Sequence, residues 1–414
     1  MLPPSTLRAC AGLGVGLVFL GCNEASESPA LLLDCRADVP AAFLSSKVDD
    51  DDGDGRTWDE DFPAVNDEDD DIADHAWMRG PDGVFHLYFQ NEGHTTGSDI
   101  EHYTSTDLQS LDYVGRALVT RLGGWDADGL WAPHVVHRDG QYAMFYTGVA
   151  GRGADAVQRI GLATSTDLTT WTRVPTNNCP GTTGDGCIYE CDEVWTTWGD
   201  APGSYNQQCR DPFVAHDAVQ RRWVLFATTK SRNQFGVVSV AYSSDLIHWT
   251  GAGFIDATRR VAGASGARAT GGQAENPHVT RYEGTYYLLF TDWQDPEDAA
   301  STPAPRTITQ YATSSLLAAD PSGSLHWTYR GAIPDPGVNA IEVQRIGPVW
   351  LMTQSISNHA SGDYFYRRQL RLKCVHWGAD FEFDTVNVTF GARSPSSAPH
   401  PLAVDVGVEN VTHD

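Results

Sequence analysis

Positive charge is scarce in this sequence of 414 residues, which holds 28 Lys and Arg against 54 Asp and Glu. The formal net charge of −26 repels phosphate groups, so the composition excludes a nucleic-acid-binding protein and any attraction to an anionic lipid surface. Half of this excess falls between Asp49 and Asp74, where fourteen acidic residues accompany one basic residue. The rest of the chain is therefore only mildly acidic.

Long apolar runs are also missing. Residues 9–20 form an apolar stretch of twelve residues, too short to cross a bilayer of about 30 Å as a helix, and Arg8 precedes it. This pattern predicts a secretory signal over residues 1–21. Its end, Phe19-Leu20-Gly21-Cys22, resembles the bacterial lipoprotein cleavage motif, which implies a lipid on Cys22. The alternative is an ordinary signal peptide with an incidental Cys22. Either reading predicts an exported protein, and the first an outer-membrane or cell-surface lipoprotein that meets the membrane only through its anchor.

Six cysteines remain once Cys10 and Cys22 are set aside, and an even number in an exported chain favours disulfides. Four of them, Cys179, Cys187, Cys191 and Cys209, fall in one loop-like insertion and are predicted to pair with each other. Local pairing would leave Cys35 and Cys374 for one another, tying the start of the chain to its end. A zinc site is less favoured, because no matching pair of Cys or His follows Cys187 and Cys191.

The acidic segment carries the spacing of a calcium loop. Acidic residues stand at loop positions one, three, five and twelve, and Gly55 at position six: Asp50, Asp52, Asp54 and Asp61. Hard Ca²⁺ binds several carboxylate oxygens around such a turn, so a structural calcium ion is one interpretation. A chance match in an acidic tether, which we assign to residues 22–69, is the other.

Repeats indicate the fold. One signature returns as WAPHV (131–135), RDPFV (210–214) and ENPHV (275–279), each followed by an aromatic or apolar strand. More divergent copies begin near Asp74 and Ala340. A second motif recurs between them as TSTDL (104–108), TSTDLTTW (164–171) and SSDLIHW (243–249). Spacings of 58 to 79 residues suit a four-stranded antiparallel blade. We predict an all-β, five-bladed β-propeller over residues 70–373, with a closing segment and tail over 374–414.

The signature opens the innermost strand of each blade, so aligning its copies predicts the residues of the central channel. Side chains alternate along a strand, which places the first and third residues on the channel and packs the proline into the blade. The first position holds Asp74, Ala132, Asp211, Asn276 and Ala340, and the third holds Ala76, His134, Phe213, His278 and Glu342. Trp131, Arg210 and Glu275 precede the first position at the rim. Three carboxylates, Asp74, Asp211 and Glu275, are thus expected at one mouth.

The order of these motifs resembles the five-bladed glycoside hydrolases, above all family 43 and its relative family 32. An Asp in the first blade, WAP in the second, Asp-Pro in the third and Glu-x-Pro in the fourth follow the family 43 pattern. The resemblance implies that Asp74 is the general base, Asp211 tunes the acid and orients the sugar, and Glu275 is the general acid. Two departures stand out: His75, not proline, follows Asp74, and the Glu-Cys acid motif of family 32 is missing.

Glycoside hydrolysis needs these residue types whatever the family, since one carboxyl must protonate the leaving oxygen and another must activate water or attack carbon. No cofactor is required. The sequence also offers groups for binding a sugar: Trp77, Trp131, Arg210, Asn276, His134, His278 and Glu342. The last three residues alternatively hold a central water cluster or a metal ion such as Ca²⁺, or form a hydrogen-bonded polar plug.

The sequence as a whole predicts a glycosidase whose partner is a carbohydrate, with arabinosides and xylosides leading by resemblance. A retaining fructosidase similar to family 32 is one alternative. A non-catalytic propeller that binds glycan or protein is the other.

Overall fold

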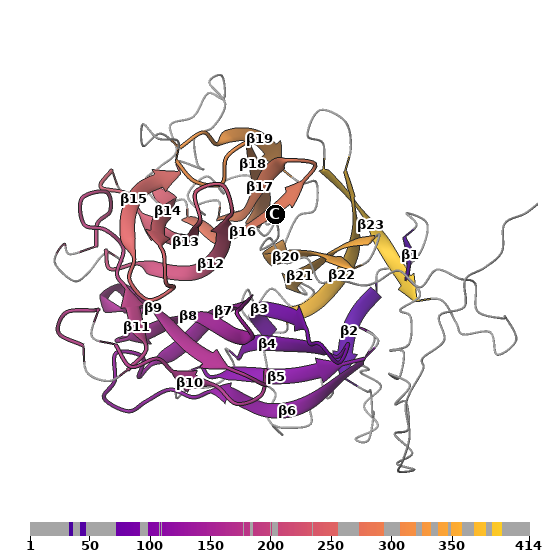
Figure 1. Cartoon of the computed structure of the whole chain (residues 1–414), viewed down its shortest axis with the longest axis horizontal. Coiled ribbons are helices and arrows are strands. Elements are labelled where there is room, and N and C mark those ends of the chain that lie inside the picture. The colour runs from indigo at the N-terminus through magenta and orange to yellow at the C-terminus, as the bar shows by residue number, and fades with distance from the viewer. Residues whose placement is uncertain are drawn as a thin grey trace, which may run out of the picture. The chain divides into compact units, whose positions relative to one another are not determined.

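Five blades of antiparallel strands stand around a central axis in the computed structural model (Figure 1). The structure describes residues 33–35, 42–46, 72–91, 98–255, 273–293, 307–319, 325–332, 338–357, 368–377 and 383–390, with short gaps at 107, 109, 177, 183–184, 199, 201–205, 234 and 347–348. This arrangement confirms the predicted all-β, five-bladed propeller. In the described part of the chain, no helix has both the length and the apolar character needed to cross a membrane.

The first four blades each run from an inner strand outward in chain order. Blade 1 contains β3 (Ile72–Arg79), β4 (Phe85–Asn91), β5 (Ile100–Ser105) and β6 (Ser110–Leu118). Blade 2 contains β7 (Gly129–Arg138), β8 (Gln141–Ala150), β9 (Val157–Ser165) and β10 (Thr172–Arg173), with the short 3-10 helix η1 (Gly153–Asp155) between β8 and β9. Blade 3 contains β12 (Cys209–Asp217), β13 (Arg222–Lys230), β14 (Gly236–Ser243) and β15 (Thr250–Ile255). Blade 4 contains β16 (Gln273–Tyr282), β17 (Thr285–Trp293), β18 (Thr307–Ser314) and β19 (Thr328–Ala332).

Blade 5 is built from both ends of the described chain. Its inner strands are β20 (Val338–Ile346), β21 (Val349–Ser357) and β22 (Arg368–Trp377). The outer edge of β22 is shared, because β23 (Phe383–Phe390) pairs with Lys373–Trp377 and β2 (Ala42–Ser46) pairs with Leu370–Leu372. Strand β2 also pairs with β6 of blade 1, and β1 (Leu33–Cys35) pairs with β23. Strands from outside residues 70–373 therefore complete the last blade and join it to the first.

Every inner strand carries a register shift at the repeated signature. In four of the five strands the first signature residue has a left-handed backbone, with φ of 45° to 53°: Ala132, Asp211, Asn276 and Ala340. That conformation costs a residue with a side chain about 1–2 kcal/mol. The bulge it creates turns the following residues toward the axis, so it shapes the centre of the propeller.

The second repeated motif forms a turn between the third and fourth strands of its blades. In blade 2, Asp167 accepts hydrogen bonds from the backbone N–H groups of Thr169 and Thr170, and from the hydroxyl of Ser165. Asp245 and Ser243 make the same contacts in blade 3. These bonds close the turn locally, which explains why a Ser-x-Asp pattern recurs at blade spacing.

The insertion predicted from the cysteines lies between blades 2 and 3. Disulfides join Cys179 to Cys187 and Cys191 to Cys209, which confirms local pairing of the four cysteines. Its strand β11 (Cys187–Tyr189) pairs with β9 of blade 2. Cys374 is also disulfide-bonded. The side chain of Cys35, its expected partner, lies outside the described residues.

Candidate active site

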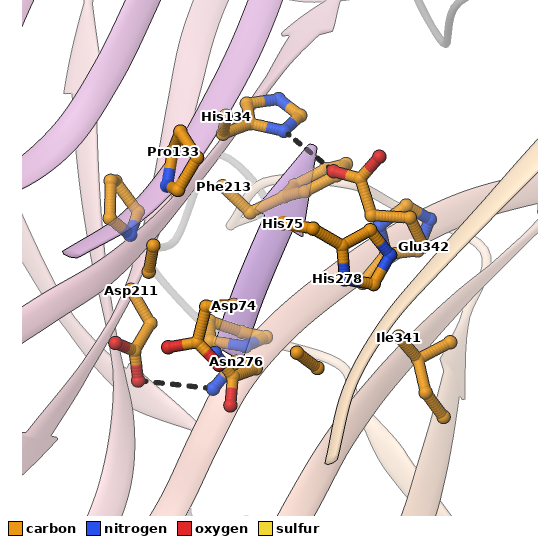
Figure 2. A pocket seen from close by; sticks show the side chains of 14 residues that line it. Asp74, His75, Pro133, His134, Asp211, Phe213, Asn276, His278, Ile341 and Glu342 are labelled. Atoms are coloured by element: carbon orange, nitrogen blue, oxygen red, sulfur yellow. Dashed lines mark hydrogen bonds and ion pairs between the residues drawn. The ribbon is translucent and has the colours of Figure 1, made fainter. Parts of the chain in front are cut away.

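The inner strands surround a cavity on the propeller axis, to which each strand contributes two or three consecutive residues (Figure 2). The first signature residues line it, as the alignment of the repeats predicts: Asp74, Ala132, Asp211, Asn276 and Ala340. The third residues of four blades line it too: His134, Phe213, His278 and Glu342. Blade 1 differs, because His75 lines the cavity in place of Ala76.

The prediction that the proline packs into the blade is wrong. Pro133, Pro212 and Pro277 all line the cavity beside their neighbours. The bulge breaks the strict alternation of side chains, so successive residues can face the same space. The cavity holds about 30 Å³, room for one or two water molecules but not for a sugar ring. A sugar must therefore be bound at its mouth.

Arg210 and two carboxylates lie together where β12 and β16 begin. The guanidinium donates from Nη2 to Glu275 Oε1 at 2.5 Å, and its Nε lies 3.5 Å from Asp211 Oδ2. Asp211 also accepts hydrogen bonds from the Thr228 hydroxyl at 2.8 Å and from the backbone N–H of Asn276 at 3.2 Å. These contacts bring Arg210, Asp211, Glu275 and Asn276 into one cluster.

Asp74 belongs to the same cluster. Figure 2 shows Asp74, Asp211 and Asn276 at one end of the cavity, away from the histidines. The negative charge of Asp74 acts on both Asp211 and Arg210. The structure thus brings together the three carboxylates that the sequence singled out, from blades 1, 3 and 4.

Burial sets the protonation of this cluster. It raises the pKa of Asp211 to about 7, and the negative charges of Asp74 and Glu275 add to the rise, although Arg210 opposes it. Burial alone would lower the pKa of Arg210, but the surrounding carboxylates raise it above its usual value. Near neutral pH Asp211 is therefore partly protonated, next to a fixed positive charge.

The other end of the cavity is a layer of imidazoles around one carboxylate. His134 Nδ1 lies 3.5 Å from Glu342 Oε1, and its Nε2 contacts the Val214 carbonyl at 3.1 Å. His278 Nε2 contacts the backbone of Val343, and His75 Nε2 contacts the Thr353 hydroxyl at 2.7 Å. Burial lowers the pKa of both His75 and His278 to about 3, so both are neutral near pH 7.

This layer does not fit Ca²⁺, which prefers six to eight oxygen ligands. Glu342 supplies its only carboxylate, and one oxygen of that group already accepts from the Trp77 backbone N–H at 3.2 Å. No group of three or more His, Cys, Asp or Glu is arranged for a metal within the part of the chain that the structure describes. The other calcium prediction, at Asp50, Asp52, Asp54 and Asp61, lies outside the described residues.

The two tryptophans predicted to stack on a sugar have different surroundings. Trp77 is 1% exposed and packs with Phe85, Leu87 and Leu351 in the core between blades 1 and 5, so it cannot contact a substrate. The strand register explains this outcome, since Trp77 takes the place of Val136, Ala215 and Thr280, which are buried as well. Trp131 is half-buried and lies near the start of β7, as Arg210 and Glu275 lie near the starts of β12 and β16.

Three polar residues of the site escaped the sequence reading: Thr147, Gln158 and Thr228. Thr147 Oγ1 accepts from the Asp211 N–H at 2.9 Å, and Gln158 Oε1 accepts from Arg210 at 3.3 Å. The sequence signal for Thr147 and Thr228 was their position, because each lies near the end of the strand that follows a signature. Gln90 holds that place in blade 1 and accepts from the Ala132 N–H at 3.2 Å. Side chains of one blade thus satisfy the N–H that a bulge releases in the next.

A five-bladed propeller with carboxylates from three blades at its mouth defines the class of propeller glycosidases. The sequence matches the family described as Glycosyl hydrolases family 43 over residues 70–382. The chain therefore belongs to that family, which is the first of the two resemblances in the sequence. A search of the curated proteins finds no match.

Solved structures with the same fold come from families 43 and 32. A thermostable family 43 glycoside hydrolase is 16% identical at a TM-score of 0.52, covering 80% of this chain and 96% of that one. The endo-arabinase of Bacteroides thetaiotaomicron is 13% identical at a TM-score of 0.52, covering 75% of this chain and 95% of that one. The Bombyx mori family 32 β-fructofuranosidase BmSUC1 is 14% identical at 0.55, covering 78% of this chain but only 63% of its own. At these identities the likeness shows the fold alone.

Proposed function

We propose that this protein hydrolyses arabinosides or xylosides of a neutral extracellular glycan, using Asp74, Asp211 and Glu275. The observation that supports this most is the cluster in which Arg210 contacts both Glu275 and Asp211 while Asp74 acts on the same groups. The endo-arabinase among its structural neighbours favours the pentoside class.

In this proposal Glu275 protonates the leaving glycosidic oxygen and Asp74 activates the water that attacks the anomeric carbon. The 2.5 Å contact between Arg210 and Glu275 must open before Glu275 can deliver its proton. A sugar hydroxyl that replaces Glu275 as the acceptor of the Arg210 hydrogen bond would open this contact and release Glu275. Asp211, with its pKa of about 7, accepts a hydrogen bond from the substrate or donates one to it.

The experiment is release of reducing sugar from arabinan, xylan, levan, inulin and aryl glycosides by the parent and by Glu275→Gln. We expect activity on a pentose substrate and a loss of about 10²–10⁴-fold in the variant. Glu190→Gln is the matched control, since Glu190 forms an ion pair of similar length, 2.6 Å, with Arg159, and neither residue lines the central cavity. No activity in the parent, or equal activity in parent and Glu275→Gln, would contradict the proposal; activity on levan or inulin would reassign the sugar.

We further propose that the protein is exported and anchored through a lipid on Cys22, as the N-terminal pattern suggests. These residues lie outside the described part of the chain. Membrane fractionation of cells that express the full chain tests the anchor, with Cys22→Ser as the variant. We expect the parent in the membrane fraction and the variant in the soluble exported fraction. The same soluble fraction for both would leave an ordinary signal peptide.

A further inference from the structure

Two exposed aromatic residues lie on neighbouring loops, one in the insertion between blades 2 and 3 and one in blade 3. In the described part of the chain, the aromatic residues among the exposed large apolar side chains are Trp195 (43%) and Phe235 (39%). The Arg232 N–H donates to the Trp195 carbonyl at 3.3 Å, and the Ser231 N–H donates to the Phe235 carbonyl at 2.8 Å. Trp195 lies in the disulfide-bonded insertion, whereas Phe235 lies in the β13–β14 loop.

Both loops stand at the end of the propeller where the carboxylates lie. Asp211 lies near the start of β12, and Thr228, which donates to it, lies two residues before the end of β13. The Lys230 carbonyl at that end accepts from the Thr197 N–H at 2.9 Å. At about 3.3 Å per strand residue, this path places Trp195 within roughly 25 Å of Asp211.

The insertion is fixed to the catalytic strand. The Cys191–Cys209 disulfide attaches it to the residue before Arg210. Asp192 Oδ1 accepts from the Val194 N–H at 2.8 Å, and Arg232 contacts Asp200 at 3.1 Å. Trp198 is buried beneath the guanidinium of Arg159 at 5.4 Å. The backbone that carries Trp195 is therefore held in place before any ligand arrives, which lowers the entropic cost of binding.

The central cavity is too small for a sugar, so a glycan chain bound at the mouth has to continue across the rim. An aromatic ring binds the C–H face of a sugar, while nearby charged groups such as Arg232 reach its hydroxyls. Two side chains present far less surface than the roughly 800 Å² per partner of a stable protein interface. A neutral glycan also suits the acidic surroundings better than an acidic one.

We infer that Trp195 and Phe235 form a distal sugar-binding subsite that holds a polymeric chain beyond the cleavage point. This inference rests on the proposed function and extends it, because it makes the preferred substrate a polysaccharide and not a short glycoside. The subsite would bind polymer without touching the reacting bond. Its removal should therefore raise KM for polymer and leave the cleavage of a short substrate unchanged.

The test compares Trp195→Ala, Phe235→Ala and Trp195→Tyr with the parent, on arabinan, arabinoxylan and 4-nitrophenyl pentosides. Val219→Ala is the control, an exposed apolar residue in the β12–β13 turn at the opposite end of blade 3. We expect kcat/KM for polymer to fall at least about tenfold in the alanine variants, with partial recovery in Trp195→Tyr and unchanged pentoside cleavage. Unchanged polymer cleavage, or an equal fall on both substrates, would overturn the inference.

Affinity electrophoresis in gels containing the same polymers keeps this inference separate from the proposed function. The parent should migrate slowly in the polymer gel, and Trp195→Ala should migrate as it does without polymer. If the parent cleaves nothing but this difference persists, the hydrolase proposal fails and the subsite stands. If the parent and Trp195→Ala are retarded equally, the subsite is refuted whether or not cleavage occurs.

Discussion

Among single residues, Asp211 both satisfies a backbone N–H of the next blade and carries a carboxyl with a raised pKa. Its carboxylate accepts the N–H of Asn276, as the Thr147 hydroxyl accepts the N–H of Asp211 one blade earlier. A neutral threonine does this without an electrostatic cost, whereas a buried carboxylate close to Asp74 and Glu275 has a raised pKa. The position therefore costs folding free energy whenever the carboxyl is ionised, which is the pattern expected of a functional group.

The stability of the parent should reflect this cost. The folded pKa of Asp211 is about 7 and its ordinary value is 3.8, so the folded state keeps the proton to higher pH. The contribution of the protonated Asp211 carboxyl to folding stability is complete below about pH 4 and is lost as the pH rises to about 7. Asp211→Asn keeps the acceptor and removes the titration. We expect its melting temperature relative to the parent to rise by at least about 2 °C from pH 5 to pH 8; a difference that does not vary with pH would refute the assignment.

At the scale of elements, the inner strands are built around a strained residue. The bulges at Ala132, Asp211, Asn276 and Ala340 share a left-handed backbone, yet none of these residues is a glycine. Asp211 and Asn276 contribute side chains to the mouth, which a glycine could not do. Ala132 and Ala340 have only a methyl group, so in blades 2 and 5 the strained residue contributes no polar side chain to the mouth.

A pair of substitutions separates backbone strain from packing. Ala340→Gly relieves the positive φ but removes a buried methyl group, so we expect nearly unchanged stability. Ala227→Gly removes an equally buried methyl group from β13, where the alanine has no positive φ, and should destabilise by about 1 kcal/mol or more. Urea unfolding of both variants measures the difference. Equal losses in the two would mean that the bulge is not strained.

At the scale of the whole molecule, the repeat made most of the architecture predictable. Each blade reuses one signature, so its five copies identified the inner strands, the axis and the three carboxylates of the mouth. The bulge was not predictable, because alanine, aspartate and asparagine give little signal for a left-handed backbone; this is why the prolines were misplaced. The shared edge of blade 5 was missed as well, since β2 pairs with β22, and β1 with β23, across more than 300 residues of sequence, and these outer strands carry no copy of the signature.

In the proposed mechanism Glu275 donates the proton and Asp74 activates the water, and the dependence of the rate on the leaving group separates these two roles. The substrates are a glycosyl fluoride, which needs no proton on its leaving group, and the natural linkage, which does. Glu275→Gln should keep activity on the fluoride within about tenfold of the parent and lose about 10²–10⁴-fold on the natural linkage, whereas Asp74→Asn should lose both. A Glu275→Gln variant that falls equally on both substrates, or on neither, would contradict the account.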